Sequence, residues 1–201
     1  LLAAYVLPND SAVDATLSLA AQRLSRATGS PSLDGYQSKD PVRALRIAEA
    51  VYVALQGAEI TYANPPASFE SDGQRVRFPS AIIATRLGTC LDLALFAAAA
   101  LEQAGLHPIM IITEGHAFVG AWLVEETFSN PVVEEPSRLA KRIELSEIVV
   151  FDATAVSSRP SPDFEGARAA ARERLQDPTE FRVAIDVQRA RLGGVRPLPT
   201  L

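Results

Sequence analysis

Cysteine, histidine, lysine and long apolar runs are all scarce in this chain of 201 residues. The single cysteine, Cys90, excludes an internal disulfide and is typical of a reducing cytoplasm, where we expect the protein to reside. No apolar run approaches the ~20 residues that a membrane-spanning helix needs, and no signal peptide with a basic start is visible. We therefore expect neither a disulfide framework nor a membrane partner.

The charge balance is acidic, with 19 basic against 24 acidic residues and a formal net charge of −5, which argues against general nucleic-acid binding. Arginines gather between Arg168 and Arg196, but acids are interspersed, which is more typical of a solvated helical face. Nucleotide-binding glycine loops and the CxxC or HxxxH spacings of zinc sites are absent from the sequence. We expect no cofactor and no metal.

Apolar spacing and capping residues predict most of the regular elements. The predicted helices are 11–28, 40–56, 79–84 and 90–104, the last of them apolar on every side, as buried helices are. The predicted strands are 108–113, 116–124 and 147–153. Segment 58–80 is rich in turn residues, 125–146 is polar, and 163–192 has an Arg-rich helical composition. We expect a domain over 1–160 and an Arg-rich helical extension and linker over 161–201.

Cys90 stands where a helix is predicted to begin. Thr89 is a favourable N-cap, and Asp92 three positions later completes a capping-box pattern. First-turn amides and the positive end of the helix dipole would stabilise the thiolate, and these amides could also donate to an oxyanion. The alternative is that Cys90 is simply a small buried hydrophobic residue.

A thiolate nucleophile needs a base, and the chain has only two histidines. His107 precedes a proline in a predicted loop, where we expect a solvated side chain. His116 begins an alternating strand, where histidine is commonly a satisfied core residue, but Gly115 and Gly120 indicate close approach of the backbone. His116 is therefore the candidate base.

Asp152 ends a predicted strand and is the candidate residue to orient the base, although aspartate at a strand end is commonly only a turn former. If this strand pairs antiparallel with the strand that His116 begins, the end of one lies beside the start of the other. Cys90, His116 and Asp152 would then be the nucleophile, the base and the orienting acid of a catalytic triad.

Three short stretches surround these residues: GTCLDLA (88–94), GHAFVG (115–120) and FDAT (151–154). Together with ITY (60–62) and RFP (77–79), they resemble a transglutaminase-like domain of the papain-like cysteine peptidase superfamily over about residues 40–155. The resemblance implies an α+β fold, in which a central helix that carries the cysteine packs on an antiparallel sheet that carries the histidine and the aspartate.

A narrower resemblance extends over nearly the whole chain. GQRVR (73–77), TCLD (89–92), the strand 116–123 and the segment 189–199 resemble a module in large bacterial proteins that are similar to superfamily I helicases. The implied partner is the rest of such a helicase-like polypeptide. Because helicase motifs are absent from this sequence, ATPase activity is not implied.

The chemistry implied by the resemblance is acyl transfer through a thioester, on an amide or isopeptide bond of a protein or peptide substrate. The acceptor stays open: water would make the protein a peptidase or deamidase, and an amine would make it a crosslinking transglutaminase. Gln74 is either an oxyanion or substrate contact or an exposed residue without a catalytic role. The alternative function is a catalytically silent docking or structural module of the helicase-like protein.

Overall fold

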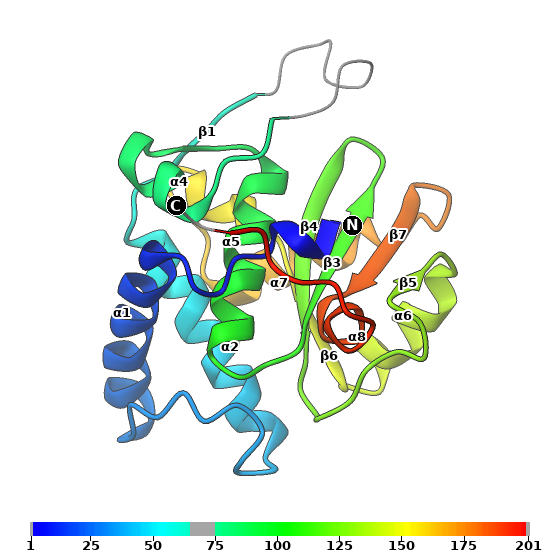
Figure 1. The fold of residues 1–201 in the computed structure, drawn as a ribbon, viewed down its shortest axis with the longest axis horizontal. Coiled ribbons are helices and arrows are strands. Elements are labelled where there is room, and N and C mark those ends of the chain that lie inside the picture. Colours follow the sequence, from blue (N-terminus) through cyan, green and yellow to red (C-terminus); the bar gives the residue numbers. More distant parts are fainter. Residues whose placement is uncertain (1, 65–74, 200–201) are drawn as a thin grey trace.

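The computed structural model describes residues 2–64 and 75–199, and Figure 1 shows the course of the chain. Its helices are α1 (Ser11–Thr28), α2 (Pro41–Gln56), α4 (Pro79–Thr85), α5 (Cys90–Gln103), α6 (Pro136–Glu144), α7 (Phe164–Arg174) and α8 (Val187–Leu192), with the 3-10 helices η1 (Leu2–Tyr5) and η2 (Ala153–Ser157). Its strands are β1 (Thr61–Tyr62), β2 (Leu87–Gly88), β3 (Pro108–Thr113), β4 (His116–Trp122), β5 (Val132–Val133), β6 (Ile148–Phe151) and β7 (Phe181–Asp186). The fold is therefore of the α+β class.

The first two long helices begin and end where the local sequence predicts. The carboxylate of Asp10 accepts the amide of Ala12 at 2.9 Å to cap α1, and Gly29 ends that helix with φ of +79°. Asp40 caps α2 in the same way, with a proline at the first helical position. These signals act within a few residues of the chain, so they do not depend on the rest of the fold.

Five strands form one sheet in the order β5-β7-β3-β4-β6, and every neighbouring pair is antiparallel. The predicted antiparallel pairing of β4 with β6 is confirmed, with Val119 opposite Phe151. β1 and β2 form a separate two-stranded parallel sheet in which Tyr62 lies opposite Gly88. This small sheet brings Tyr62 close to the beginning of α5.

Helix α5 lies between the sheet on one side and α1 and α2 on the other (Figure 1). Alternation along β4 divides the sheet into two faces: Ala117, Val119 and Ala121 belong to the core that contains α5. Phe118 and Trp122 belong to a second core on the other face. The predicted burial of α5 on every side is confirmed. Within 2–64 and 75–199, no helix has the length and apolar character to cross a membrane.

Two glycines of the β3–β4 region are needed for different physical reasons. A Cβ at Gly120 would lie 2.8 Å from the carbonyl oxygen of Val149, so this glycine permits the close approach of β6. Gly115 has open space around its Cα but a φ of +64°, a backbone conformation that favours glycine. The expected close approach is thus confirmed at Gly120, whereas Gly115 serves the turn before His116.

The prediction that 163–192 is helical throughout is wrong, because this segment contains β7 between α7 and α8. β7 pairs with β3 and β5, so residues 161–201 contribute a strand to the central sheet. Asp186 secures it: its buried carboxylate accepts the indole N–H of Trp122 at 3.0 Å and the amide of Phe128 at 2.8 Å. Arginines surround β7, but its own residues alternate Phe181, Val183 and Ile185, which favour a strand, and β3 supplies the pairing partner.

Candidate active site

Cys90 is the first residue of α5, and the predicted capping box encloses it. The amide of Asp92 donates to the hydroxyl of Thr89 at 3.2 Å, and the amide of Thr89 donates to the carboxylate of Asp92 at 3.0 Å. Cys90 is only 6% exposed. The helix start thus holds the thiol in a defined, largely dehydrated position.

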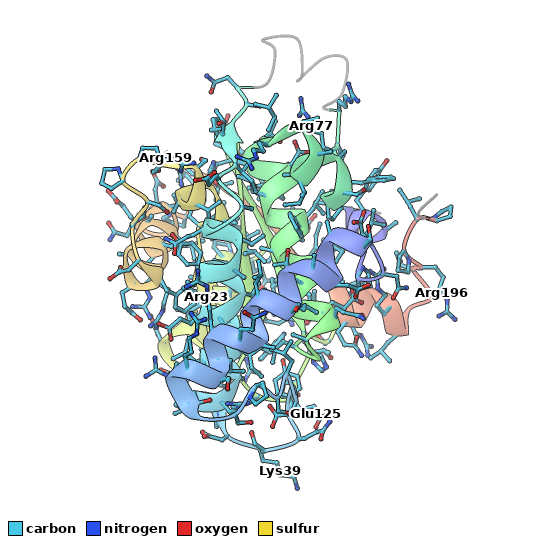
Figure 2. All side chains as sticks on the ribbon, turned by 90° about the vertical axis from the view of Figure 1, so that its left-hand side faces the viewer. Arg23, Lys39, Arg77, Glu125, Arg159 and Arg196 are labelled. Carbon is cyan, nitrogen blue, oxygen red and sulfur yellow. The ribbon has the colours of Figure 1, made fainter. Side chains whose placement is uncertain are left out.

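Asp92 also holds a distant segment against this helix start. Its carboxylate accepts the backbone amide of Arg77 at 2.8 Å and the guanidinium of the same residue at 3.0 Å. The Asp92 side chain is fully buried. In Figure 2, Arg77 lies at the end of the molecule where β1 lies, which is where α5 begins. Asp92 is therefore a structural acid of the site.

We expect Asp92→Ala to lower the free energy of unfolding by roughly 2–4 kcal/mol, because it leaves buried donors of Thr89 and Arg77 without their acceptor. Urea denaturation followed by circular dichroism measures this loss. Glu49→Ala is the control, since Glu49 pairs with Arg46 in an exposed ion pair worth at most about 1 kcal/mol. Equal losses in the two variants would contradict the structural role of Asp92.

The imidazole of His116 and the carboxylate of Asp152 are hydrogen-bonded, with 2.9 Å between Nε2 and Oδ2. Antiparallel pairing of β4 and β6 causes this, since His116 begins β4 and Asp152 directly follows β6. The backbone amide and hydroxyl of Thr154 donate to Oδ1 of Asp152, at 2.9 and 2.6 Å. The side chains of His116 and Asp152 are only 9% and 5% exposed. The distance lies within the range expected for a base and its orienting acid.

The thiol of Cys90 lies beside the same imidazole, close enough for each group to shift the pKa of the other. Because Nε2 of His116 faces Asp152, Nδ1 is the ring nitrogen left for the sulfur. The backbone amide of Ala117 and the hydroxyl of Tyr62 also lie near the sulfur, and both help to lower the pKa of the thiol. The structure therefore brings Cys90, His116 and Asp152 together in the order that the sequence predicts.

The electrostatics of the cluster favour a thiolate beside an imidazolium. Burial alone disfavours the charged forms, but hydrogen bonds to Asp152 and Cys90 outweigh it and raise the pKa of His116 to about 9. Burial likewise opposes ionisation of Cys90, yet the hydrogen bond and charge of His116 lower the pKa of the thiol. The pKa of Asp152 is also lowered, since His116 and Thr154 outweigh its burial. His116 is therefore largely protonated at neutral pH, and the thiolate of Cys90 is favoured relative to that of an ordinary cysteine.

Tyr62 is a site residue that sequence reasoning did not single out. Its hydroxyl contacts the sulfur of Cys90 and accepts the backbone amide of that residue. Burial, followed by the negative charge of Cys90, raises the pKa of Tyr62 to about 12, so the hydroxyl stays protonated. The sequence signal that pointed to Tyr62 was the ITY stretch of the resemblance. A two-residue strand, however, has no periodicity that would show where the side chain of Tyr62 lies.

The predicted role of Gln74 concerns a residue outside the described part of the chain, where residues 65–74 of the turn-rich segment 58–80 all lie. The polar segment 125–146 contains β5 and α6, which pack on β6 and β7. A hollow of about 390 Å³ is lined by His107, Lys39 and Glu125. Figure 2 shows Lys39 and Glu125 at the end of the molecule opposite Arg77. This hollow therefore lies away from Cys90.

A second hollow, of about 310 Å³, lies between α1 and α2 and is likewise not lined by the cluster of Cys90. Among the described residues, no group of three or more His, Cys, Asp or Glu side chains is arranged to hold a metal ion. Comparisons with protein-family models, with curated protein sequences and with solved structures find no match for this chain. The geometry of the Cys90 cluster and the sequence resemblance are therefore the basis for assigning a chemistry to the site.

Proposed function

We propose that this protein is a thiol-dependent enzyme of the transglutaminase-like type, which transfers an acyl group from an amide or isopeptide bond of a protein or peptide. One observation carries the proposal: the buried imidazole of His116 lies between the thiol of Cys90 and the carboxylate of Asp152. A nucleophile beside a base that is itself hydrogen-bonded to an orienting acid is the arrangement that covalent acyl transfer needs.

The reaction follows from the charges of the resting pair. The thiolate of Cys90 attacks the carbonyl carbon and forms a C–S bond, which places a negative charge on the carbonyl oxygen. When the C–N bond breaks, the leaving amine takes a proton from the imidazolium of His116. Water or a second amine then gives its proton to the neutral imidazole, attacks the thioester and releases the thiolate. Asp152 holds the imidazole in the required orientation throughout.

Tyr62 is suited to bind the oxyanion of this reaction. Its hydroxyl lies next to the sulfur and next to the amide of Cys90, so both groups are close to the carbon that the sulfur would attack. The raised pKa of Tyr62 keeps the hydroxyl a donor at neutral pH. A hydroxyl that turns from the sulfur to the carbonyl oxygen as negative charge develops there provides the electrostatic stabilisation that acyl transfer uses.

We expect Tyr62→Phe to lower kcat by about 10²–10³-fold with a small change in KM, because the lost donor acts on the transition state. Steady-state kinetics with a glutamine-containing peptide measures the effect. Tyr5→Phe is the control, since Tyr5 is an exposed tyrosine of η1. A KM effect with unchanged kcat would instead assign Tyr62 to substrate binding.

The proposal is tested first by alkylation of Cys90 with iodoacetamide across pH 4–10, read by intact mass. Because Cys90 is the only cysteine, every label reports this thiol. We expect rapid reaction well below the ~8.5 of a free thiol, and a shift towards that value in His116→Ala, which removes the imidazolium. A wild-type rate that rises only above pH 8 and is the same in His116→Ala would contradict the proposal and favour the docking module.

The acceptor is then identified with glutamine-containing proteins, with and without a fluorescent primary amine. Ammonia release without amine incorporation would indicate a deamidase, amine incorporation a transglutaminase, and new chain ends a peptidase. Each product requires the same thioester with Cys90, so the assay selects among acceptors. The rest of a helicase-like polypeptide is the proposed physical partner, and its own lysines and glutamines are included among the substrates tested.

A further inference from the structure

The carboxylate of Asp152 interacts with more groups than the one histidine that the acid of a catalytic triad orients. Oδ1 accepts both donors of Thr154, and Oδ2 accepts Nε2 of His116 at 2.9 Å. Oδ2 also lies 3.4 Å from Nε of Arg174. One buried carboxylate oxygen is thus shared between the imidazole and a guanidinium.

Arg174 reaches this oxygen from the part of the chain beyond residue 160. It is the last residue of α7, which packs against β6. The amide of Asp152 donates to the carbonyl of Ala167 in the middle of that helix at 3.0 Å, so α7 is fixed to the residue that Arg174 contacts. The side chain of Arg174 is 42% exposed, whereas that of Asp152 is buried. The helix therefore delivers a permanent positive charge to the buried carboxylate from the solvent side.

We propose that Arg174 is a positioning residue of the Cys90–His116–Asp152 cluster, which holds the carboxylate of Asp152 and limits the negative charge that it presents to His116. This inference rests on the proposed function, because only a reacting thiolate and imidazole make that charge matter. It assigns a role in the site to the Arg-rich C-terminal segment. The composition of that segment alone indicated a solvated face.

The direction of the effect follows from electrostatics. A cation beside the pair favours the forms with fewer protons, so Arg174 lowers the pKa of His116 against the raising effect of Asp152. The same charge favours the thiolate of Cys90. Removing it therefore moves both titrations to higher pH. Among the described residues, Tyr62 of β1 interacts with Cys90 and Asp152, and Tyr52 of α2 interacts with Asp152.

Arg174→Gln tests the inference by two readouts that do not need turnover. The alkylation profile of Cys90 and the imidazole NMR titration of His116 are each expected to move to higher pH by about 0.5 unit or more. Thermal unfolding followed by circular dichroism checks that the variant is folded.

Two matched variants distinguish the direct contact of Arg174 with Asp152 from a general effect of positive charge on α7. Arg172→Gln removes the same charge from the same exposed stretch of α7 and is expected to leave both profiles within about 0.2 pH unit of wild type. Arg174→Lys keeps the charge and is expected to restore most of the wild-type profile. If Arg174→Gln proves unstable, Arg174→Lys is the variant that is tested. Alkylation and NMR profiles of Arg174→Lys that move to higher pH by the full ~0.5 unit or more would then overturn the inference.

The inference and the proposed function fail in different ways. If Arg174→Gln and Arg172→Gln have the same profiles as wild type, Arg174 has no positioning role, whatever the activity. If the Arg174→Gln profiles move as expected but no amide substrate reacts with the wild-type protein, the proposed function is wrong while the electrostatic contact is confirmed. A loss of kcat in Arg174→Gln that is recovered at higher pH supports both together.

Discussion

The Cys90→Ala variant is expected to lose acyl transfer by about 10⁵–10⁶-fold while remaining folded. The sulfur forms the covalent bond of the proposed reaction, and none of the other groups in the cluster replaces it. The structural cost is small, because the change removes a single side-chain atom. We expect at most about 1–2 kcal/mol in the free energy of unfolding.

Three measurements check this expectation. Turnover of a glutamine-containing peptide gives the rate, urea denaturation gives the stability, and intact mass after brief exposure to substrate detects the thioester in wild type alone. Cys90→Ser is the companion variant, since the hydroxyl is a far weaker nucleophile beside the same imidazole. Residual activity above about 1% in a folded Cys90→Ala sample would mean that another group reacts.

Asp152→Asn is expected to lower kcat by about 10³–10⁴-fold. The asparagine keeps the size of the side chain but removes the charge that holds His116 in its tautomer and raises its pKa. We therefore expect the imidazole to titrate below about 9, at or under the ordinary histidine value, so that the imidazolium is lost at neutral pH.

Kinetics and the NMR titration of His116 measure the two parts of this effect separately. The matched control is Asp34→Asn, which removes a carboxylate that pairs with Arg43 at 3.1 Å in the segment between α1 and α2. An Asp152→Asn protein with unchanged kcat would show that Asp152 only ends its strand. A lowered kcat with an unchanged imidazole titration would contradict the assignment of Asp152 as the partner that sets the charge of His116.

Much of the site could be predicted because its parts depend on local rules. The capping box of Thr89 and Asp92 places Cys90 at a helix start through contacts within four residues. The pairing of β4 with β6 follows from their alternation and from their order in the chain. These two features suffice to bring His116 and Asp152 together and to identify the helix end that carries the thiol.

Other parts of the fold could not be predicted, because they are stabilised by pairing and packing with segments that are distant in the sequence. β7 forms in an Arg-rich segment, since its residues complete the hydrogen bonds of β3. Similarly, the polar stretch 125–146 contains β5 and α6, whose Leu139 is buried in the core on the far face of the sheet. A short element that is stabilised mainly by its neighbours leaves little periodicity in the sequence.

By itself, the sequence determined the principal helices, the strand that carries His116, and the three residues that could form a triad, because caps and alternation act over a few residues. Only the tertiary structure decided what surrounds them. Alternation alone places His116 on the face of Phe118, away from α5, yet at the end of the strand its imidazole meets Cys90. Tyr62 and Arg174 reach the site from segments far apart in the chain, and such contacts arise when buried elements pack.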